Sequence, residues 1–304
     1  MATPIPPLPA SVLRYVAQVF GKANRHICSR IAMVPNTAEE SLDQALVTFL
    51  AGYASPRIVE PGWAVRIDTH FLGGMRHWGR WEIADIGLLV FVKQNSQVVA
   101  HKTALLQSKR LYPSAGTVDD ETKDDFHLGI HRLIPSKGAS TSLSLSHVFE
   151  FSTDSAYKAM KVADDQWTAI EDFEDKTNLN VFYLLYNPWA LDARYRYPAE
   201  HDPAPLGPSA NGGCRVVPYG AMRAALDTHS SGYTPKFSDA QKAMRFLTKG
   251  HAGWTLEHFV AYEVMKCRKG NLFDGADDPK IVPLFARQAP IAASVSVTIE
   301  HFKG

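Results

Sequence analysis

Two short apolar runs that lie close together constrain the fold of this chain most strongly. They occupy residues 81–92 and 102–110, and a polar stretch, Gln94-Asn95-Ser96-Gln97, falls in the gap between them. Apolar runs of this length, bounded by polar residues, are typical of strands in the interior of a sheet. The sequence therefore predicts two adjacent strands joined as a hairpin.

Each predicted strand carries polar residues that a buried strand does not need: Asp85 in the first, and Gln107 and Lys109 in the second. Side chains alternate between the two faces of a strand, so Gln107 and Lys109 point the same way, while Ser108 and Arg110 point the other way. Burial of an unpaired carboxylate or ammonium group costs far more than burial of a methyl group. A divalent metal would resolve this conflict, with oxygens of Asp85 and Gln107 as hard ligands and Lys109 facing a water or a phosphate.

This spacing resembles that of the PD-(D/E)XK nuclease superfamily, in which an Asp on one strand is followed on the next by an acid or Gln, any residue, and Lys. Gln107-Ser108-Lys109 matches the Q-x-K variant of that motif. The resemblance implies an α/β fold with a restriction-endonuclease-like core, in which helices flank a central mixed sheet. It also implies hydrolysis of phosphodiester bonds, with DNA expected ahead of RNA as the substrate and Mg²⁺ or Mn²⁺ as the cofactor.

A glutamate on a helix before the first catalytic strand often serves this superfamily as a further metal ligand. Residues 38–53 are predicted to form such a helix, with Thr37 as its N-cap. Glu39 extends the apolar stripe of this helix, whereas Glu40 falls on the side of Asp43, so Glu39 is the first candidate and Glu40 the second. The alternative is that both acids only favour the helix N-terminus electrostatically.

The predicted site follows from these assignments. Its catalytic residues are Glu39, Asp85, Gln107 and Lys109, of which Glu39, Asp85 and Gln107 are the expected metal ligands. Supporting roles are expected for Glu40, Glu82 and Gln166, although strand alternation turns Glu82 away from Asp85. Arg80, Lys102 and Arg110 are the expected contacts to nucleic-acid phosphates, and the alternative is an ordinary solvated charged face.

The remaining sequence predicts three regions: a helical segment at 1–35, a nuclease-like core at 36–190, and an α/β extension at 191–304. Within the core, residues 58–71 alternate like a strand, residues 111–150 form an exposed or mobile insertion, and a helix at 156–173 leads into a strand at 180–188. Residues 189–213 are predicted to be a linker or long loop. In the extension, the predicted elements are strands at 214–218 and 291–302 and helices near 221–226, 238–247 and 255–267.

Composition limits the function classes only weakly. A formal charge of +1 gives no global attraction to nucleic acid, so a local basic patch would have to supply it. The three cysteines are far apart and show neither a zinc spacing nor a disulfide framework. The N-terminus lacks a signal-peptide pattern, and the apolar runs are far shorter than the ~20 residues of a membrane span, which predicts a cytoplasmic protein.

Two other interpretations stay open. One keeps the fold but not the catalysis, so that the chain would be a nucleic-acid-binding or regulatory subunit. The other treats Asp85 and Lys109 as a buried ion pair in an α/β protein of different function. The resemblance further suggests a role in restriction or anti-phage defence, with control by self-association or by an activating partner protein, on fold-level analogy alone.

Overall fold

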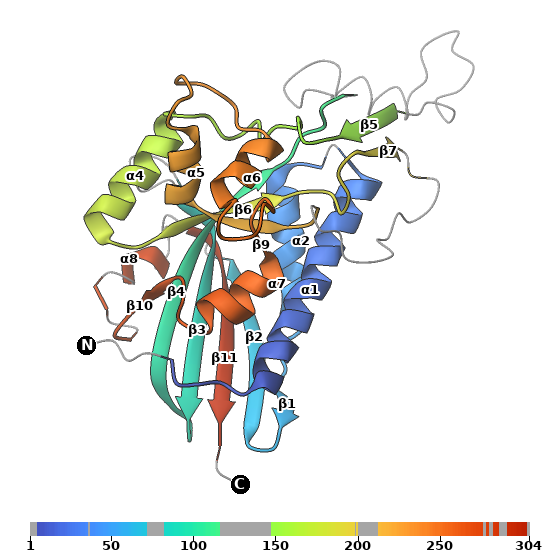
Figure 1. Cartoon of the computed structure of the whole chain (residues 1–304). Coiled ribbons are helices and arrows are strands. Elements are labelled where there is room, and N and C mark those ends of the chain that lie inside the picture. Colours follow the sequence, from blue (N-terminus) through green and yellow to red (C-terminus); the bar gives the residue numbers. More distant parts are fainter. Residues whose placement is uncertain are drawn as a thin grey trace.

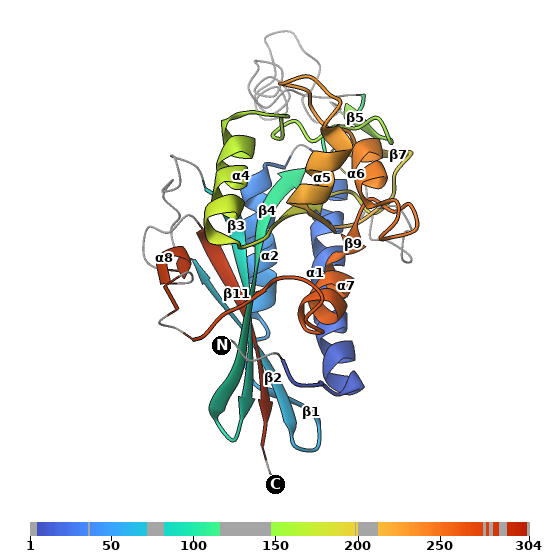
Figure 2. The same cartoon turned by 60° about the vertical axis from the view of Figure 1, so that its left-hand side comes forward.

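The computed structural model describes residues 5–35, 37–71, 82–115, 147–197, 199, 212–275, 278–279, 282–285 and 291–302. Within these residues nine strands form one mixed sheet in the order β1-β2-β11-β3-β4-β6-β8-β9, and β10 pairs with β4. Helices lie on both sides of this sheet, with α1 and α7 on one side and α8 on the other (Figure 1, Figure 2). The predicted α/β class, with a central mixed sheet flanked by helices, is confirmed at this level.

The strands of the large sheet are β1 (Arg57–Glu60), β2 (Trp63–Phe71), β3 (Ala84–Gln94), β4 (Gln97–Arg110), β6 (Val181–Tyr186), β8 (Arg215–Pro218), β9 (Trp254–Thr255), β10 (Asn271–Leu272) and β11 (Ile291–His301). A separate two-stranded sheet pairs β5 (His147–Phe151) with β7 (Ala193–Tyr197). The helices are α1 (Ala10–Met33), α2 (Glu39–Ala51), α4 (Asp165–Thr177), α5 (Tyr219–Leu226), α6 (Phe237–Met244), α7 (Leu256–His258), the π-helix η2 (Phe259–Val264) and α8 (Val282–Phe285). In the described part of the chain, no helix is both long enough and apolar enough to cross a bilayer.

The predicted hairpin is confirmed as β3 and β4. The two strands pair antiparallel from Ile86↔Leu106 to Gln94↔Gln97. The turn residues Asn95 and Ser96 both have positive φ, 50° and 66°. Two consecutive left-handed residues suit the right-handed twist of the strands they join.

The C-terminal strand β11 lies in the middle of the sheet, between β2 and β3. It runs antiparallel to β2 and parallel to β3. Its residues alternate between buried and half-buried positions over most of its length, which is the pattern that predicted a strand there. The predicted extension 191–304 therefore shares one sheet with the predicted core, and the boundary near residue 190 does not separate two sheets.

Several predicted element boundaries are wrong for local reasons. Thr37 is not the N-cap of α2; Ala38 holds that position, and the Thr37 hydroxyl donates to the Val34 carbonyl. The helix predicted at 156–173 begins only at Asp165, because the Asp164 side chain accepts from Trp167 N at 2.8 Å and caps it.

Two longer predicted segments also differ from the structure. The helix predicted at 255–267 is divided into α7 and η2. The predicted linker 189–213 contains β7, which pairs with β5. Most of the predicted insertion, residues 116–146, lies outside the described residues.

Candidate active site

Strand β4 continues beyond the end of its neighbour β3. The β3 register stops at Ile86↔Leu106, whereas β4 stays paired with β6 as far as Arg110↔Tyr186. Backbone N–H groups at such an edge need acceptors. Carboxylates supply them: Ser108 N donates to Asp85 Oδ2 at 2.7 Å, and Arg110 N donates to Glu39 Oε2 at 2.7 Å.

Asp85 and Gln107 lie side by side, as the alternation of the two strands predicted. The Gln107 amide Nε2 donates to Asp85 Oδ2 at 2.5 Å, and the same oxygen accepts from Ser108 N and from the Ser108 hydroxyl. Gln107 is 2% exposed, and its carbonyl oxygen Oε1 has no hydrogen-bond partner among the described residues. A buried polar atom without a partner costs about 1–3 kcal/mol, so this oxygen needs an explanation.

Helix α2 brings two acids to the edge of β4. Glu39 Oε1 accepts from Lys109 Nζ at 3.2 Å. Asp43, one turn further along the helix, accepts from the Tyr186 hydroxyl at 2.6 Å, and its Oδ2 lies 2.7 Å from Ser108 Oγ. Glu39, the predicted helical acid, therefore lies beside Lys109 at the edge of β4, whereas Lys109 was expected to face a water or a phosphate.

Asp43, Ser108 and Tyr186 belong to this cluster although they were not predicted as site residues. Asp43 had been grouped with Glu40 on the outer side of the helix, but its position four residues after Glu39 was the available signal, since residues at this spacing share a helix face. Ser108 was expected to point away from Gln107 and Lys109. It reaches the same acids because they stand beside the edge of β4, where Ser108 N and Ser108 Oγ both contact Asp85.

The two contacts of the Ser108 hydroxyl need one more hydrogen than the hydroxyl has. Its oxygen lies 2.7 Å from Asp43 Oδ2 and 2.8 Å from Asp85 Oδ2. A hydroxyl has a single hydrogen and can donate to only one of these oxygens. In the absence of a cation, one of the two carboxyl groups must carry the proton that the other contact requires.

The directions of the pKa shifts in the cluster agree with the need for an additional proton. Burial, followed by the charge of Asp85, raises the pKa of Asp43 well above its ordinary value. Burial also raises the pKa of Asp85 and of Glu39, against the opposing charge of Lys109. Burial alone lowers the pKa of Lys109, but the charges of Glu39 and Asp85 outweigh this and raise it. Lys109 is thus a permanent cation facing carboxyl groups that resist full ionisation.

The donor set suits a hard divalent cation. Carboxylate and amide oxygens are the ligands that Mg²⁺ prefers, and a bound cation would favour the charged form of carboxyl groups whose pKa burial raises. The partnerless Gln107 Oε1 is an oxygen of that kind. In the conformation described, however, no group of three or more His, Cys, Asp or Glu residues is arranged to hold a metal ion. The residues fit the chemistry of a cation, although their acids now bond mainly to the chain itself.

The predicted supporting residues lie around the cluster at different distances. Glu40 is exposed, and its charge contributes to the raised pKa of Asp85. Glu82 is half-buried, two residues before the start of β3. Gln166 lies in the first turn of α4, and among the described residues it makes no side-chain hydrogen bond to the cluster.

Two of the predicted nucleic-acid contacts are buried, Lys102 to 1% and Arg110 to 2% exposure. The Arg110 guanidinium donates to the Pro35 carbonyl at 2.5 Å and stacks over the Tyr112 ring, 4.2 Å from its centroid. Lys102 interacts with the side chain of Cys267. In this conformation neither side chain is exposed for contact with a phosphate. Arg80 lies outside the described residues.

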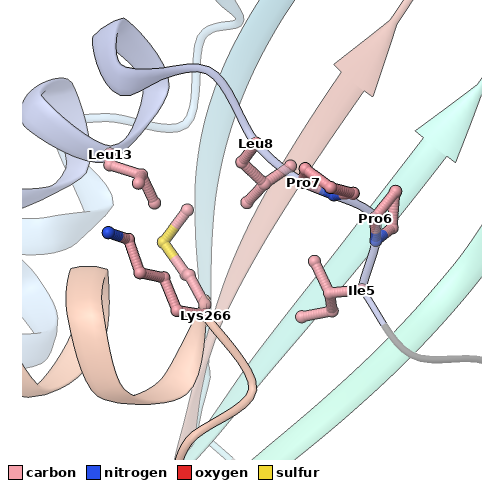
Figure 3. A pocket seen from close by; sticks show the side chains of 7 residues that line it. Ile5, Pro6, Pro7, Leu8, Leu13 and Lys266 are labelled. Carbon is pink, nitrogen blue, oxygen red and sulfur yellow. The ribbon is translucent and has the colours of Figure 1, made fainter.

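A cavity of about 320 Å³ lies away from this cluster, between the segment before α1 and the end of η2. Figure 3 shows Ile5, Pro6, Pro7 and Leu8 along one side of it and Leu13 and Lys266 on the other. Its lining is mostly apolar and contains no carboxyl group. It therefore offers no alternative to the acidic cluster as a site of acid–base or metal chemistry.

Comparison with known proteins adds no further evidence for a function. No family model, no curated protein and no solved structure matches the chain. The case for a function depends on the cluster itself.

Proposed function

We propose that the chain is a metal-dependent nuclease that hydrolyses phosphodiester bonds, most readily as a DNA endonuclease. One observation carries the proposal: the buried, partnerless Oε1 of Gln107 lies on an amide bonded to Asp85. Lys109 follows two residues further along β4 and bonds to Glu39 of α2. Asp, Gln and Lys are the residue types of the sequence motif, and a helical Glu is the further ligand that the resemblance suggested.

The order of the elements is consistent with a restriction-endonuclease-like core. Helix α2 precedes β2, β3 and β4; α4 follows, and β6 returns parallel to β4. Strand β11, inserted between β2 and β3, departs from the simple form of this core. It leaves the relation between Asp85 and β4 intact, because β3 and β4 are direct neighbours.

Asp85, Gln107 and Glu39 would hold Mg²⁺ or Mn²⁺ in this proposal. The ion would supply a Lewis acid for the phosphate oxygens and lower the pKa of a bound water. The Gln107 amide can turn about its terminal bond so that Oε1, instead of Nε2, faces Asp85. Two acceptors then face each other, and this orientation is stable only beside a cation.

Each residue of the chain has a distinct part in the proposed reaction. Lys109 stays protonated because its pKa is raised, so it stabilises negative charge on the phosphate rather than removing a proton from water. A proton shared by Asp43, Ser108 and Asp85 would leave if the cation were bound. Tyr186 and Ser108 fix the orientation of the Asp43 carboxyl group.

A nucleic-acid-binding protein without catalysis is the second candidate. One feature favours it, since Asp85 and Glu39 already act as acceptors for the unpaired edge of β4. In that case the acids would be required for folding and a cation would not be needed.

The deciding experiment is cleavage of supercoiled plasmid and of end-labelled single-stranded DNA and RNA, in Mg²⁺, Mn²⁺ or EDTA. Asp85→Asn and Lys109→Met test the cluster, and Asp165→Asn, an exposed acid on α4, is the matched control purified in the same way. We expect metal-dependent cleavage by the wild type and the control, with a loss of at least about a hundredfold in both cluster variants. Equal cleavage by all four proteins would identify a contaminant and refute the assignment. Unchanged binding with no cleavage in any metal would favour the second candidate.

A further inference from the structure

A second polar pocket lies on the same sheet as the acidic cluster. It has a volume of about 410 Å³, which is within the range of small-ligand sites. Its walls come from β8, β9, η2 and the loop before β9, and we call it the Arg215 pocket after the residue at its base. Its lining includes the cations Arg215, Lys249 and Arg268 and a single carboxyl group, Glu263.

The register of the sheet relates this pocket to the acidic cluster. Lys109 pairs with Leu185, Leu185 pairs with Arg215, and Arg215 pairs with Thr255. Residues directly opposite each other on neighbouring strands share one face. Neighbouring strands lie about 4.8 Å apart, so the backbone of Arg215 lies roughly 10 Å from that of Lys109 in the same row.

The base of the pocket is rigidly built. Arg215 is 3% exposed, and its guanidinium donates to the carbonyls of Gly212 at 2.9 Å and Gly253 at 3.4 Å. Gly253 has φ of 141°, and a Cβ there would lie 2.7 Å from the Val216 carbonyl oxygen. Only glycine therefore lets this loop pack so closely on β8.

Two cations of the lining are accessible, and an exposed aromatic residue precedes the lining in the chain. Lys249 and Arg268 are exposed, and Phe246, just before the lining residue Leu247, is 93% exposed. Trp254 forms part of the lining. Glu263 belongs to the π-helix η2 and is engaged by His258 at 3.3 Å and Arg268 at 3.5 Å. π-helical turns are rare and occur frequently at functional sites.

We propose that the Arg215 pocket binds one unpaired nucleotide of a nucleic-acid strand that passes the acidic cluster. Lys249 and Arg268 neutralise its phosphate, and an aromatic ring stacks on its base. The ligand is single-stranded, because a base must leave its partner before it can enter a concave site. The relation to cleavage rests on the proposed nuclease function, whereas the binding itself does not.

Binding is tested by fluorescence anisotropy with a labelled 12-nucleotide oligothymidylate and with a duplex of the same length, in EDTA so that no metal-dependent cleavage occurs. The variants are Lys249→Ala/Arg268→Ala and Phe246→Ala. The matched controls are Lys161→Ala/Lys176→Ala, two exposed lysines elsewhere, and Phe71→Ala, another exposed ring. Circular dichroism confirms that each variant is folded.

We expect the double variant to bind the single strand about tenfold more weakly, with a salt slope smaller by about 0.7, since a single strand contributes ~0.7 per neutralised phosphate and the pocket holds one. Phe246→Ala should weaken binding about fivefold, and the controls should stay within about twofold of wild type. A nucleoside monophosphate should displace the oligonucleotide at lower concentration than inorganic phosphate does. Wild-type affinity in both pocket variants, equally tight binding of the duplex, or equal displacement by inorganic phosphate would each overturn the proposal.

Asp85→Asn separates this proposal from the nuclease proposal. It should retain wild-type affinity for the oligonucleotide while losing cleavage. If Asp85→Asn cleaves normally, the proposed function fails, but the binding result at the pocket stands. If cleavage depends on Asp85 and binding does not depend on Lys249, Arg268 or Phe246, the pocket proposal fails alone.

Discussion

Replacement of Asp43 by Asn should stabilise the metal-free protein. The carbonyl of an amide side chain at this position can accept from the Tyr186 hydroxyl, and its NH₂ group can donate to Ser108 Oγ, which leaves the single Ser108 hydrogen for Asp85. Every contact is then satisfied without the extra proton. The substitution keeps the shape of the side chain and removes only its charge.

The upper limit of the magnitude is the repulsion that Asp43 and Asp85 would have if both were ionised. Their nearest oxygens both contact the Ser108 hydroxyl, and two charges about 5 Å apart at an effective dielectric constant of about 20 repel by about 3 kcal/mol. Both carboxyl groups are partly exposed, so we expect a net gain of about 1–2 kcal/mol at pH 8. This corresponds to a rise of about 2–3 °C in the melting temperature.

The gain should depend on pH with a definite sign. A carboxyl group whose folded pKa is raised stabilises the folded state below its unfolded pKa, near 4, and loses that contribution as pH rises through the folded pKa. The wild type should therefore become less stable between about pH 4 and the raised pKa of Asp43, and Asp43→Asn should not follow this part of the decline.

The assay is thermal unfolding followed by circular dichroism from pH 4 to 8.5 in EDTA. Asp175→Asn, an exposed acid on α4, is the matched control and should change the melting temperature by less than about 1 °C. Destabilisation by Asp43→Asn at every pH would refute the reasoning. It would mean that the carboxylate is ionised and acts as a structural acceptor.

Three further predictions concern the same cluster. Lys109→Met should lower the free energy of unfolding by about 2 kcal/mol in urea titrations at pH 7, because Glu39 loses its partner in a mostly buried site. An unchanged free energy of unfolding would mean that the ion pair is not formed. Tyr186→Phe removes the donor to Asp43 and should destabilise by about 1 kcal/mol, more at pH 8 than at pH 5, in the same titrations. Binding of Mg²⁺ should release protons at pH 6–7, because the pKa values of Asp43 and Asp85 are raised. Calorimetry in two buffers of different ionisation enthalpy measures the number of protons released. Zero release would contradict the proton count at Ser108.

The sequence predicted best what depends on local pattern. The alternation of two apolar runs identified the hairpin of β3 and β4 and brought Asp85 beside Gln107. The same pattern placed Ser108 on the wrong side, because alternation describes a strand with neighbours on both edges, and β4 loses one of them after Leu106. The position of β11 in the centre of the sheet depends on pairing between residues more than 200 positions apart, and no local signal reports such pairing.

The sequence also did not indicate which charged side chains are buried. Lys102 has the polar neighbours His101 and Thr103, and Arg110 follows Lys109 at the end of the strand, so the sequence allowed both to be solvated charges. In the structure β4 is covered on both sides, so both side chains lie inside. Chain pattern distinguishes the two faces of a strand, but it does not indicate which faces other elements cover.

The cluster contains more acceptors than the edge of β4 needs, and this is the strongest reason to expect that it has a role other than folding. Capping the edge of β4 requires two acceptors, one for Ser108 N and one for Arg110 N, and neutral amide oxygens would serve without a desolvation penalty for charge. Asp43 contacts neither of these N–H groups, and Gln107 Oε1 contacts no donor within the described residues. An additional acid and a partnerless oxygen are unfavourable for a protein that needs only a stable strand edge. They become favourable together when a cation is present, because a single ion neutralises the acids and provides the missing partner of the amide.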